Sequence, residues 1–231
     1  KNTESFVKKM NEKAQELDMK NSLFRNPHGL DQEDGGNIST AYDMAKLTSY
    51  AMKNKNFKKI VATEKYTLKT NKNTYVWHNK NKLLYRYKYT TGGKTGFTKI
   101  ARRTLVTTAS KNNLNLVVVT LNDGNDFTDH ENLFEYAFNN YTNYKILSKG
   151  FIKIKKENYY KKHKLYIKND YSYPLSIDEK DSIRIKYQLK KIRKLKNNSK
   201  VGIAKIYFGD KLVHEENIYL KYSSKKSKGW F

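Results

Sequence analysis

Hydrophobic residues near the start of the chain recur at the spacing of an α-helix. Phe6, Met10, Ala14 and Leu17 are separated by lysine, glutamate and other polar residues. This spacing places the apolar side chains on one side of a helix. It predicts an amphipathic helix over residues 4–18 that packs on a core.

A long irregular segment and a second helix are expected next. Residues 24–37 are rich in asparagine, aspartate and glycine, which favour loops. Ser39 or Thr40 can cap a helix whose first turn contains Asp43. We expect this helix to end near residues 53–56. Its apolar side consists of Met44, Leu47 and Ala51.

From about Ile60 the hydrophobic period changes toward two, which is typical of β-strands. Tyr66 and Leu68 alternate with lysine and threonine, and the apolar residues 75–77 follow a polar Asn-Lys-Asn turn. We therefore expect strands on both sides of that turn.

A second pair of β-rich runs follows at residues 103–109 and 114–121. They are joined by the polar residues 110–113, which favours a hairpin. Residues 117–119 are three successive valines, as in a strand buried on both faces. We expect the glycine-rich segment 90–98 to pair with this hairpin in a central antiparallel sheet.

The remainder of the chain begins with a predicted helix and continues with strands. Thr128 and Glu131 have capping-box spacing, which predicts that a helix opens there. After residues 144–150 we find only short β-type runs, including a hairpin with a two-residue turn led by Gly209. Further alternating apolar positions of this region are Ile183, Ile185, Tyr187 and Leu189.

Composition restricts the partners and the chemistry. The 231 residues carry a net charge of +25, which attracts polyanions such as anionic lipid, wall polymer or nucleic acid. Net charge is the only feature that favours nucleic-acid binding, so we expect no nucleic-acid partner. With no cysteine and five scattered histidines, no disulfide, thiol nucleophile or metal site is expected. No apolar run approaches the roughly 20 residues of a membrane span.

Lys94 and Thr95, bracketed by Gly93 and Gly96, are the leading candidates for binding an anionic group. An exposed turn is the alternative interpretation of this segment. Acyl transfer around a Lys-Thr-Gly strand also needs a Ser-x-x-Lys nucleophile and a second serine motif. Ser-x-x-Lys begins at Ser5 and Ser223, and Ser-x-Asn at Ser110, but we expect surface or turn positions for all three.

Several segments occur together in an order that indicates a family. They are residues 6–14, 26–31 (Asn-Pro-His-Gly-Leu-Asp), 39–45, 93–98 and 104–106. In this order they resemble serine-type D-Ala-D-Ala carboxypeptidases of peptidase family S11, the low-molecular-mass penicillin-binding proteins. Residues 201–213 more weakly resemble that family's C-terminal β domain, and Arg102-Arg103 is similar to its sporulation-associated branch.

The resemblance implies an α+β fold in two domains. Residues 1–149 would form a partial β-lactamase/transpeptidase-like domain, an antiparallel sheet with helices. Residues 150–231 would form a small all-β, sandwich-like domain. The implied enzyme trims D-Ala from peptidoglycan stem peptides through an acyl-serine intermediate, without metal or cofactor. It would also bind β-lactams, and it would lie outside the cytoplasm at the membrane of the cell envelope.

The resemblance also implies roles for individual residues. Lys94 would attract the terminal carboxylate, Thr95 would donate a hydrogen bond to it, and the backbone N–H of Phe97 would donate to an oxyanion. Gly96 would keep the strand edge open for the ligand. In that family the catalytic serine motifs precede the helix expected at residues 4–18. We therefore expect this chain alone to lack the nucleophile and to be inactive.

Other polar residues have structural interpretations that we prefer. In the family pattern His28 belongs to a structural loop, and Asp31 and Asp43 are turn and helix-cap residues. Tyrosine and lysine alternate over residues 85–89 and 159–166, which predicts strands with outward lysines rather than base-stacking surfaces. A non-catalytic module that binds anionic wall polymer or a membrane surface remains the alternative function.

Overall fold

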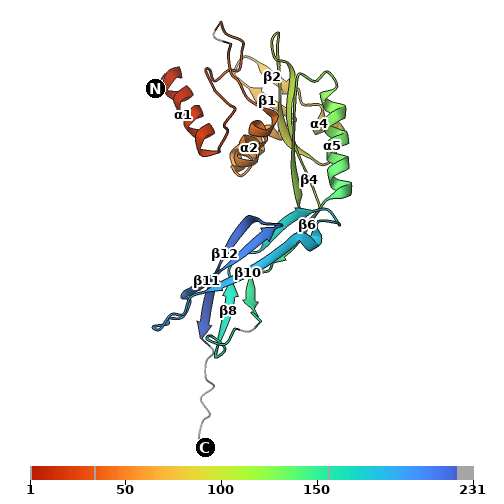
Figure 1. Cartoon of the computed structure of the whole chain (residues 1–231). Helices are drawn as coiled ribbons and strands as arrows, with labels where there is room; N and C mark the ends of the chain where they lie inside the picture. Colours follow the sequence, from red (N-terminus) through yellow and green to blue (C-terminus); the bar gives the residue numbers. More distant parts are fainter. Residues whose placement is uncertain (1, 34, 156, 223–231) are drawn as a thin grey trace, which may run out of the picture. The chain divides into compact units, whose positions relative to one another are not determined.

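The computed structural model describes residues 2–33, 35–155 and 157–222 (Figure 1). The chain folds into two compact units, residues 1–139 and 140–231, and each is described separately below. Both units contain antiparallel sheets, and the first also contains helices. The α+β prediction is therefore confirmed. The assignment of domains 1–149 and 150–231 stays a prediction.

The two helices predicted from hydrophobic spacing are present in the first unit. α1 spans Thr3–Glu16, and Asn2 caps it by accepting a hydrogen bond from the backbone N–H of Ser5 at 3.0 Å. α2 spans Ala41–Ala51. Its cap is Thr40, whose hydroxyl oxygen accepts from the Asp43 N–H at 3.2 Å.

Asp43 does more than mark the first turn of α2. Its side chain is buried, and Oδ2 accepts hydrogen bonds from the N–H of Asn21 and the hydroxyl of Ser22, both at 2.9 Å. Two polar groups of the segment after α1 are thereby satisfied by one carboxylate. Asp43 thus ties that segment to α2, which agrees with its structural interpretation.

The region from residue 53 to residue 89 differs from the prediction at two places. Where α2 was expected to fray, a separate helix α3 (Lys55–Val61) begins, because Asn54 accepts hydrogen bonds from two backbone N–H groups. The prediction of a strand at residues 85–89 is wrong, since a short helix, α4 (Leu83–Arg86), overlaps this segment. Its fully buried Leu83 packs inward, and this burial outweighs the local alternation.

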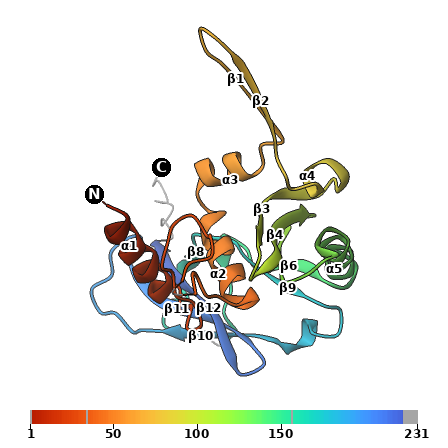
Figure 2. The same ribbon diagram turned by 90° about the horizontal axis from the view of Figure 1, so that it is seen from above.

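Between these helices, β1 (Lys65–Lys69) and β2 (Thr74–His78) form the predicted antiparallel hairpin. The hairpin projects from the rest of the first unit, as Figure 2 shows from above. All ten of its strand residues are exposed.

The central sheet is antiparallel with the order β3-β4-β5, as predicted. The strands are β3 (Thr90–Thr98), β4 (Arg102–Lys111) and β5 (Leu114–Leu121). The turn between β4 and β5 uses Asn112 and Asn113 at positive φ. The prediction that residues 117–119 are buried on both faces is wrong, because these three valines are only half-buried. Their strand, β5, is the last in the order of the sheet among the described residues.

α5 (Asp126–Asn140) packs on the sheet through a buried histidine. The two ring nitrogens of His130 lie 2.5 Å from the hydroxyl of Thr107 on β4 and 3.1 Å from that of Thr120 on β5. The helix begins two residues before the predicted capping box. The carbonyl of Asn125 already accepts from the N–H of Thr128, so Thr128 lies in the first turn.

The second unit consists of two antiparallel sheets and agrees with the sandwich-like prediction. One sheet has the order β10-β11-β12-β8-β7, and β6 pairs with β9 in the other. Gly209 and Asp210 form the predicted turn between β11 and β12. The strand predicted at residues 159–166 is confirmed only from His163 onward, where β8 begins. The bounds are β6 Thr142–Leu147, β7 Gly150–Ile152, β8 His163–Ile167, β9 Tyr171–Leu175, the 3-10 turn η1 Lys180–Ser182, β10 Ile183–Leu189, β11 Lys200–Phe208 and β12 Lys211–Tyr222.

Candidate substrate-binding pocket

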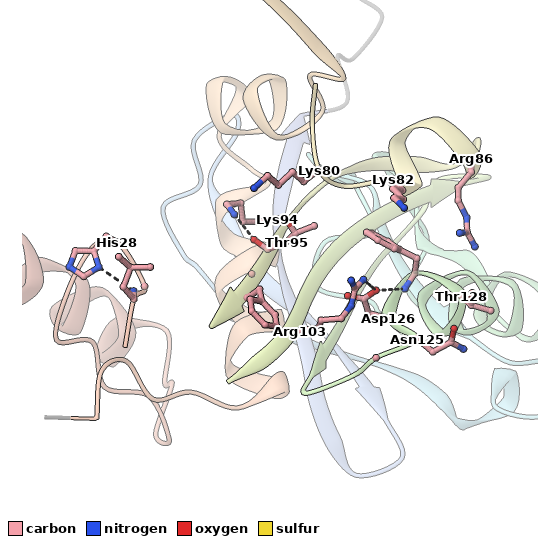
Figure 3. Close-up of a pocket in the computed structure, with 16 residues that line it drawn as sticks. His28, Lys80, Lys82, Arg86, Lys94, Thr95, Arg103, Asn125, Asp126 and Thr128 are labelled. Atoms are coloured by element: carbon pink, nitrogen blue, oxygen red, sulfur yellow. Dashed lines mark hydrogen bonds and ion pairs between the residues drawn. The ribbon is translucent and has the colours of Figure 1, made fainter. Parts of the chain in front are cut away.

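A pocket of about 730 Å³ lies in the first unit, beside the edge strand β3 (Figure 3). Five segments that are distant in sequence form its wall. They are the loop at residues 28–30, the residues around α4, the strands β3 and β4, and the turn into α5. The fold therefore brings residues that are distant in sequence into one wall.

All four residues predicted from the Lys-Thr-Gly segment line this pocket. They are Lys94, Thr95, Gly96 and Phe97. The ammonium group of Lys94 is exposed and donates a hydrogen bond to the carbonyl of Thr95. Phe97 is 66% exposed, so its ring is available to a ligand rather than to the core. The interpretation of the segment as a turn is wrong, since it is a nine-residue strand.

Two glycines allow β3 to lie close to its neighbours. A Cβ atom on Gly93 would lie 2.4 Å from the carbonyl oxygen of Val106 and 3.0 Å from the side-chain nitrogen of Asn81. A Cβ atom on Gly96 would lie 2.4 Å from the hydroxyl of Thr104. Neither position has room for a side chain. These glycines therefore set how closely the pocket strand approaches β4.

Four further cations line the pocket, and no sequence pattern assigned them to a binding site. They are Lys80, Lys82, Arg86 and Arg103. The guanidinium group of Arg86 binds both carboxylate oxygens of Glu131, at 2.6 and 2.7 Å. Arg103 Nη2 lies 2.5 Å from Asp126 Oδ1. The hydrogen bonds to these carboxylates raise the pKa of both arginines.

The three pocket lysines are not matched in this way. Among the described residues, no ion pair involves Lys80, Lys82 or Lys94. The single carboxylate in the wall, Asp126, is already bound to Arg103. The pocket therefore carries an uncompensated positive charge, and it suits a ligand with one or more carboxylates.

The loop with the Pro-His-Gly sequence forms one side of the pocket. The side chain of Asn26 is buried, and its oxygen accepts from the N–H of Gly29 at 2.6 Å. His28 Nδ1 accepts from the N–H of Leu30 at 3.1 Å. Asp31 accepts from the N–H of Ile100 at 3.3 Å. His28 and Asp31 thus make the loop contacts expected of them, although His28 also reaches the pocket wall.

No serine lines the pocket in the part of the chain that the structure describes; its hydroxyl groups are those of Thr95 and Thr128. Ser5 lies on α1, where its hydroxyl donates to the carbonyl of Asn2 at 2.9 Å. Ser110 is near the end of β4, next to the turn. The candidate at Ser223 lies outside the described residues. The position of Ser5 agrees with its predicted surface role. The prediction that Ser110 lies in the turn is wrong, because Ser110 pairs with Asn115 and the turn consists of Asn112 and Asn113.

Two features are absent from the described residues. No group of three or more histidine, aspartate or glutamate side chains lies close enough together to hold a metal ion. Among those same residues, no helix has the length and apolar character needed to cross a membrane.

Comparison with known proteins identifies two family matches along the chain. D-alanyl-D-alanine carboxypeptidases of peptidase family S11 match residues 2–125. The C-terminal domain of penicillin-binding protein 5 matches residues 141–226. Together the two matches cover segments of both compact units.

Individual relatives agree with these matches. The D-alanyl-D-alanine carboxypeptidase DacF of Bacillus subtilis is 40% identical over 117 residues, which cover 50% of this chain and 30% of DacF. DacB2 of Mycobacterium tuberculosis is 35% identical over 115 residues, which cover 50% of this chain and 40% of DacB2. The chain thus spans less than half the length of these curated relatives.

A solved structure extends the likeness to the fold of nearly the whole chain. Penicillin-binding protein 5 from Haemophilus influenzae superimposes with a TM-score of 0.69 at 24% sequence identity. The superposition covers 96% of this chain and 66% of that protein.

Proposed function

Because the chain belongs to the D-alanyl-D-alanine carboxypeptidase family, we propose that its pocket binds the carboxylate end of a peptidoglycan stem peptide that terminates in D-Ala-D-Ala. One observation carries the proposal: Lys94 and Thr95 lie in a wall whose three lysines have no acidic partner among the described residues. The reaction of the complete enzyme is hydrolysis of the last peptide bond through an acyl-serine. β-Lactams are ligands of the same pocket.

Three groups on β3 have separate roles in this proposal. The ammonium group of Lys94 attracts the terminal carboxylate, and the hydroxyl of Thr95 donates a hydrogen bond to it. The backbone N–H of Phe97 donates to the oxygen that becomes negative as the scissile carbonyl is attacked. One such donor typically contributes about 3 kcal/mol to transition-state stabilisation. Gly96, which has no side chain, leaves the strand edge open to the peptide.

The proposal separates binding from chemistry. Residues 1–149 act as the penicillin-binding domain and residues 150–231 as the β-rich domain. Since no serine lines the pocket among the described residues, this polypeptide binds the peptide end but does not become acylated. Fluorescent penicillin should therefore give no covalent label on the 231-residue chain.

A calorimetric titration tests the binding step. The wild-type chain should bind a D-Ala-D-Ala peptide, and amidation of the terminal carboxylate should weaken binding at least about tenfold. Lys94→Ala should weaken it to a similar degree. Lys8→Ala removes an equal charge from the surface of α1 and should have little effect. Equal affinity for the acid and the amide would contradict the proposal.

We also propose an extracytoplasmic location in the cell envelope, with an anionic membrane or wall surface as a further partner. The net charge of +25 supports this partner, because such a surface attracts polyanions. Binding to purified cell-wall sacculi should then fall steeply as salt is raised, and should not depend on Lys94. Salt-independent sedimentation would exclude this electrostatic attraction.

A further inference from the structure

The β1–β2 hairpin has one face that is entirely apolar and exposed. Tyr66 is paired with Trp77, and Leu68 with Tyr75, so these four side chains lie on the same face of the ribbon. Their exposed fractions are between 41% and 57%. We call these four residues the hairpin face. Two-stranded ribbons are marginally stable in water, so an exposed face of this kind favours a ligand that covers it.

The three aromatic rings of the hairpin face are nearly parallel. The Trp77 ring lies 6.2 Å from that of Tyr66 and 5.6 Å from that of Tyr75, measured between centroids. The interplanar angles are 17° and 6°. The rings of Tyr66 and Trp77 lie across the ribbon from each other, and that of Tyr75 follows Trp77 along β2, so three nearly parallel rings form one cluster. A repeating ligand with flat, weakly polar units could contact them in succession.

A second pocket, of about 860 Å³, lies at the base of the hairpin. Tyr66, Trp77 and the 69%-exposed Ile60 supply its apolar surface. Hydrogen-bonding and charged groups surround that surface. They belong to Asn56, Lys59, Thr63, Glu64, His78 and Asn79.

This combination matches the chemistry of an amino-sugar ring. The C–H groups of a pyranose pack on an aromatic face, whereas its hydroxyl and acetamido groups need donors and acceptors at the rim. A purely apolar ligand would offer no hydrogen-bond partner to the carboxylate of Glu64 and the imidazole of His78. The mixed lining therefore favours a polysaccharide over a lipid chain.

The second pocket and the proposed peptide site are lined by consecutive residues of the chain. Asn79 lines the hairpin pocket, and the next residue, Lys80, lines the pocket that contains Lys94. Asn79 is held firmly, because its side-chain nitrogen donates to the carbonyl of Thr63 at 3.0 Å and its backbone N–H to that of Glu64 at 2.8 Å. One ligand with a sugar chain and a carboxylate-ended peptide can thus reach both pockets.

We propose that the hairpin face and its basal pocket bind the glycan strand of peptidoglycan, from which the stem peptide in the Lys94 pocket extends. This inference rests on the proposed function for the choice of polymer. The aromatic rings contact the sugars, and the polar rim contacts their substituents. The hairpin would then select peptides attached to a glycan strand over free peptides.

Titration of the 231-residue chain with a tetramer of N-acetylglucosamine tests the proposal, because this probe contains neither peptide nor carboxylate. Wild type should bind it, and Trp77→Ala should raise the Kd at least about tenfold through the loss of stacking. Trp77→Phe, which retains a ring, should keep most of the affinity. Tyr42→Ala removes an aromatic ring that is 72% exposed elsewhere in the same unit, and it should have no effect.

The outcomes distinguish this inference from the proposed function. Lys94→Ala should weaken peptide binding at least about tenfold and leave tetramer binding unchanged. Absence of tetramer binding, or equal affinity of wild type and Trp77→Ala, overturns the glycan site even if peptide binding persists. Trp77-dependent sedimentation with phosphatidylglycerol vesicles, without tetramer binding, would mean that the face inserts into lipid and would also overturn it. Unchanged circular dichroism of Trp77→Ala shows that the variant is folded.

Discussion

Arg103 on β4 donates a hydrogen bond to Asp126 in the first turn of α5, with Nη2 and Oδ1 2.5 Å apart. The carboxylate is nearly buried, at 4% exposure, whereas the arginine side chain is 44% exposed. Asp126 Oδ1 also accepts from the N–H of Phe127 at 2.8 Å. The pair therefore fastens the start of α5 to the sheet at the wall of the peptide pocket.

Removal of the arginine should cost stability, because the buried carboxylate would lose its cationic partner. For Arg103→Ala we expect unfolding in urea to require about 1 kcal/mol less free energy. This value is small because the exposed guanidinium is screened by solvent. Arg102→Ala removes the neighbouring exposed charge and should change stability much less. Equal effects of the two substitutions would contradict a structural role for the pair.

Removal of the carboxylate should instead change ligand binding. Asp126→Asn leaves Arg103 uncompensated and adds one unit of positive charge to the pocket. The affinity for a carboxylate-ended peptide should rise about two- to fivefold at low salt and return toward the wild-type value at high salt. Asp129→Asn changes the same net charge outside the pocket wall and is the matched control. If both variants bind the peptide equally, the local charge of the pocket does not control affinity.

Stability should depend on the protonation of His130. Burial lowers the pKa of this histidine to about 4 from an ordinary value of 6.5. Between about pH 6.5 and pH 4 the unfolded chain binds a proton that the folded chain does not. Folding should therefore lose stability as the pH falls through this range, by up to about 3 kcal/mol, with no further loss from this group below about pH 4.

Urea unfolding at several pH values measures this dependence. His130→Gln should give a flatter dependence between pH 6.5 and pH 4, whatever its stability at neutral pH. His28→Gln, in an exposed loop, should retain the wild-type slope. Parallel curves for wild type and His130→Gln would show that another group causes the loss.

Gly93 in β3 and Gly124 in the wall of the peptide pocket should differ in their tolerance of substitution. A Cβ atom on Gly93 would lie 2.4 Å from the Val106 carbonyl oxygen, whereas one on Gly124 would meet no atom within 4 Å. Gly93→Ala should therefore cost about 2–3 kcal/mol and reduce peptide binding. Gly124 lines the pocket, and Gly124→Ala should cost less than about 1 kcal/mol of stability. Thermal unfolding compares the two, and a neutral Gly93→Ala would show that β3 can shift.

Much of the fold could be predicted because local rules agreed with tertiary packing. Helical spacing identified α1, and Thr40 capped α2 as expected. Strand alternation and turn residues identified the hairpin of β1 and β2 and the one turned by Gly209. The predictions failed where packing overrode the local pattern. The burial of Leu83 turns an apparent strand into α4.

The peptide pocket could be predicted only in part. The Lys94 segment was identified because its four lining residues are adjacent in the chain. Lys80, Arg103 and Asp126 were not, because no spacing rule connects residues that come from three different elements. The hairpin face could also be predicted only in part. Its strands could be predicted, but the exposure of Trp77 could not.

The sequence alone therefore determined the family, the helices α1 and α2, the paired strands of the first unit and the Lys-Thr-Gly strand, since each depends on motifs or spacings of residues that are near one another in the chain. Only the tertiary structure decided that Arg103 and Asp126 neutralise each other and that the pocket lysines have no such partner among the described residues. Charge compensation depends on distances between side chains from separate elements. Those distances are set when β3, β4 and α5 pack together.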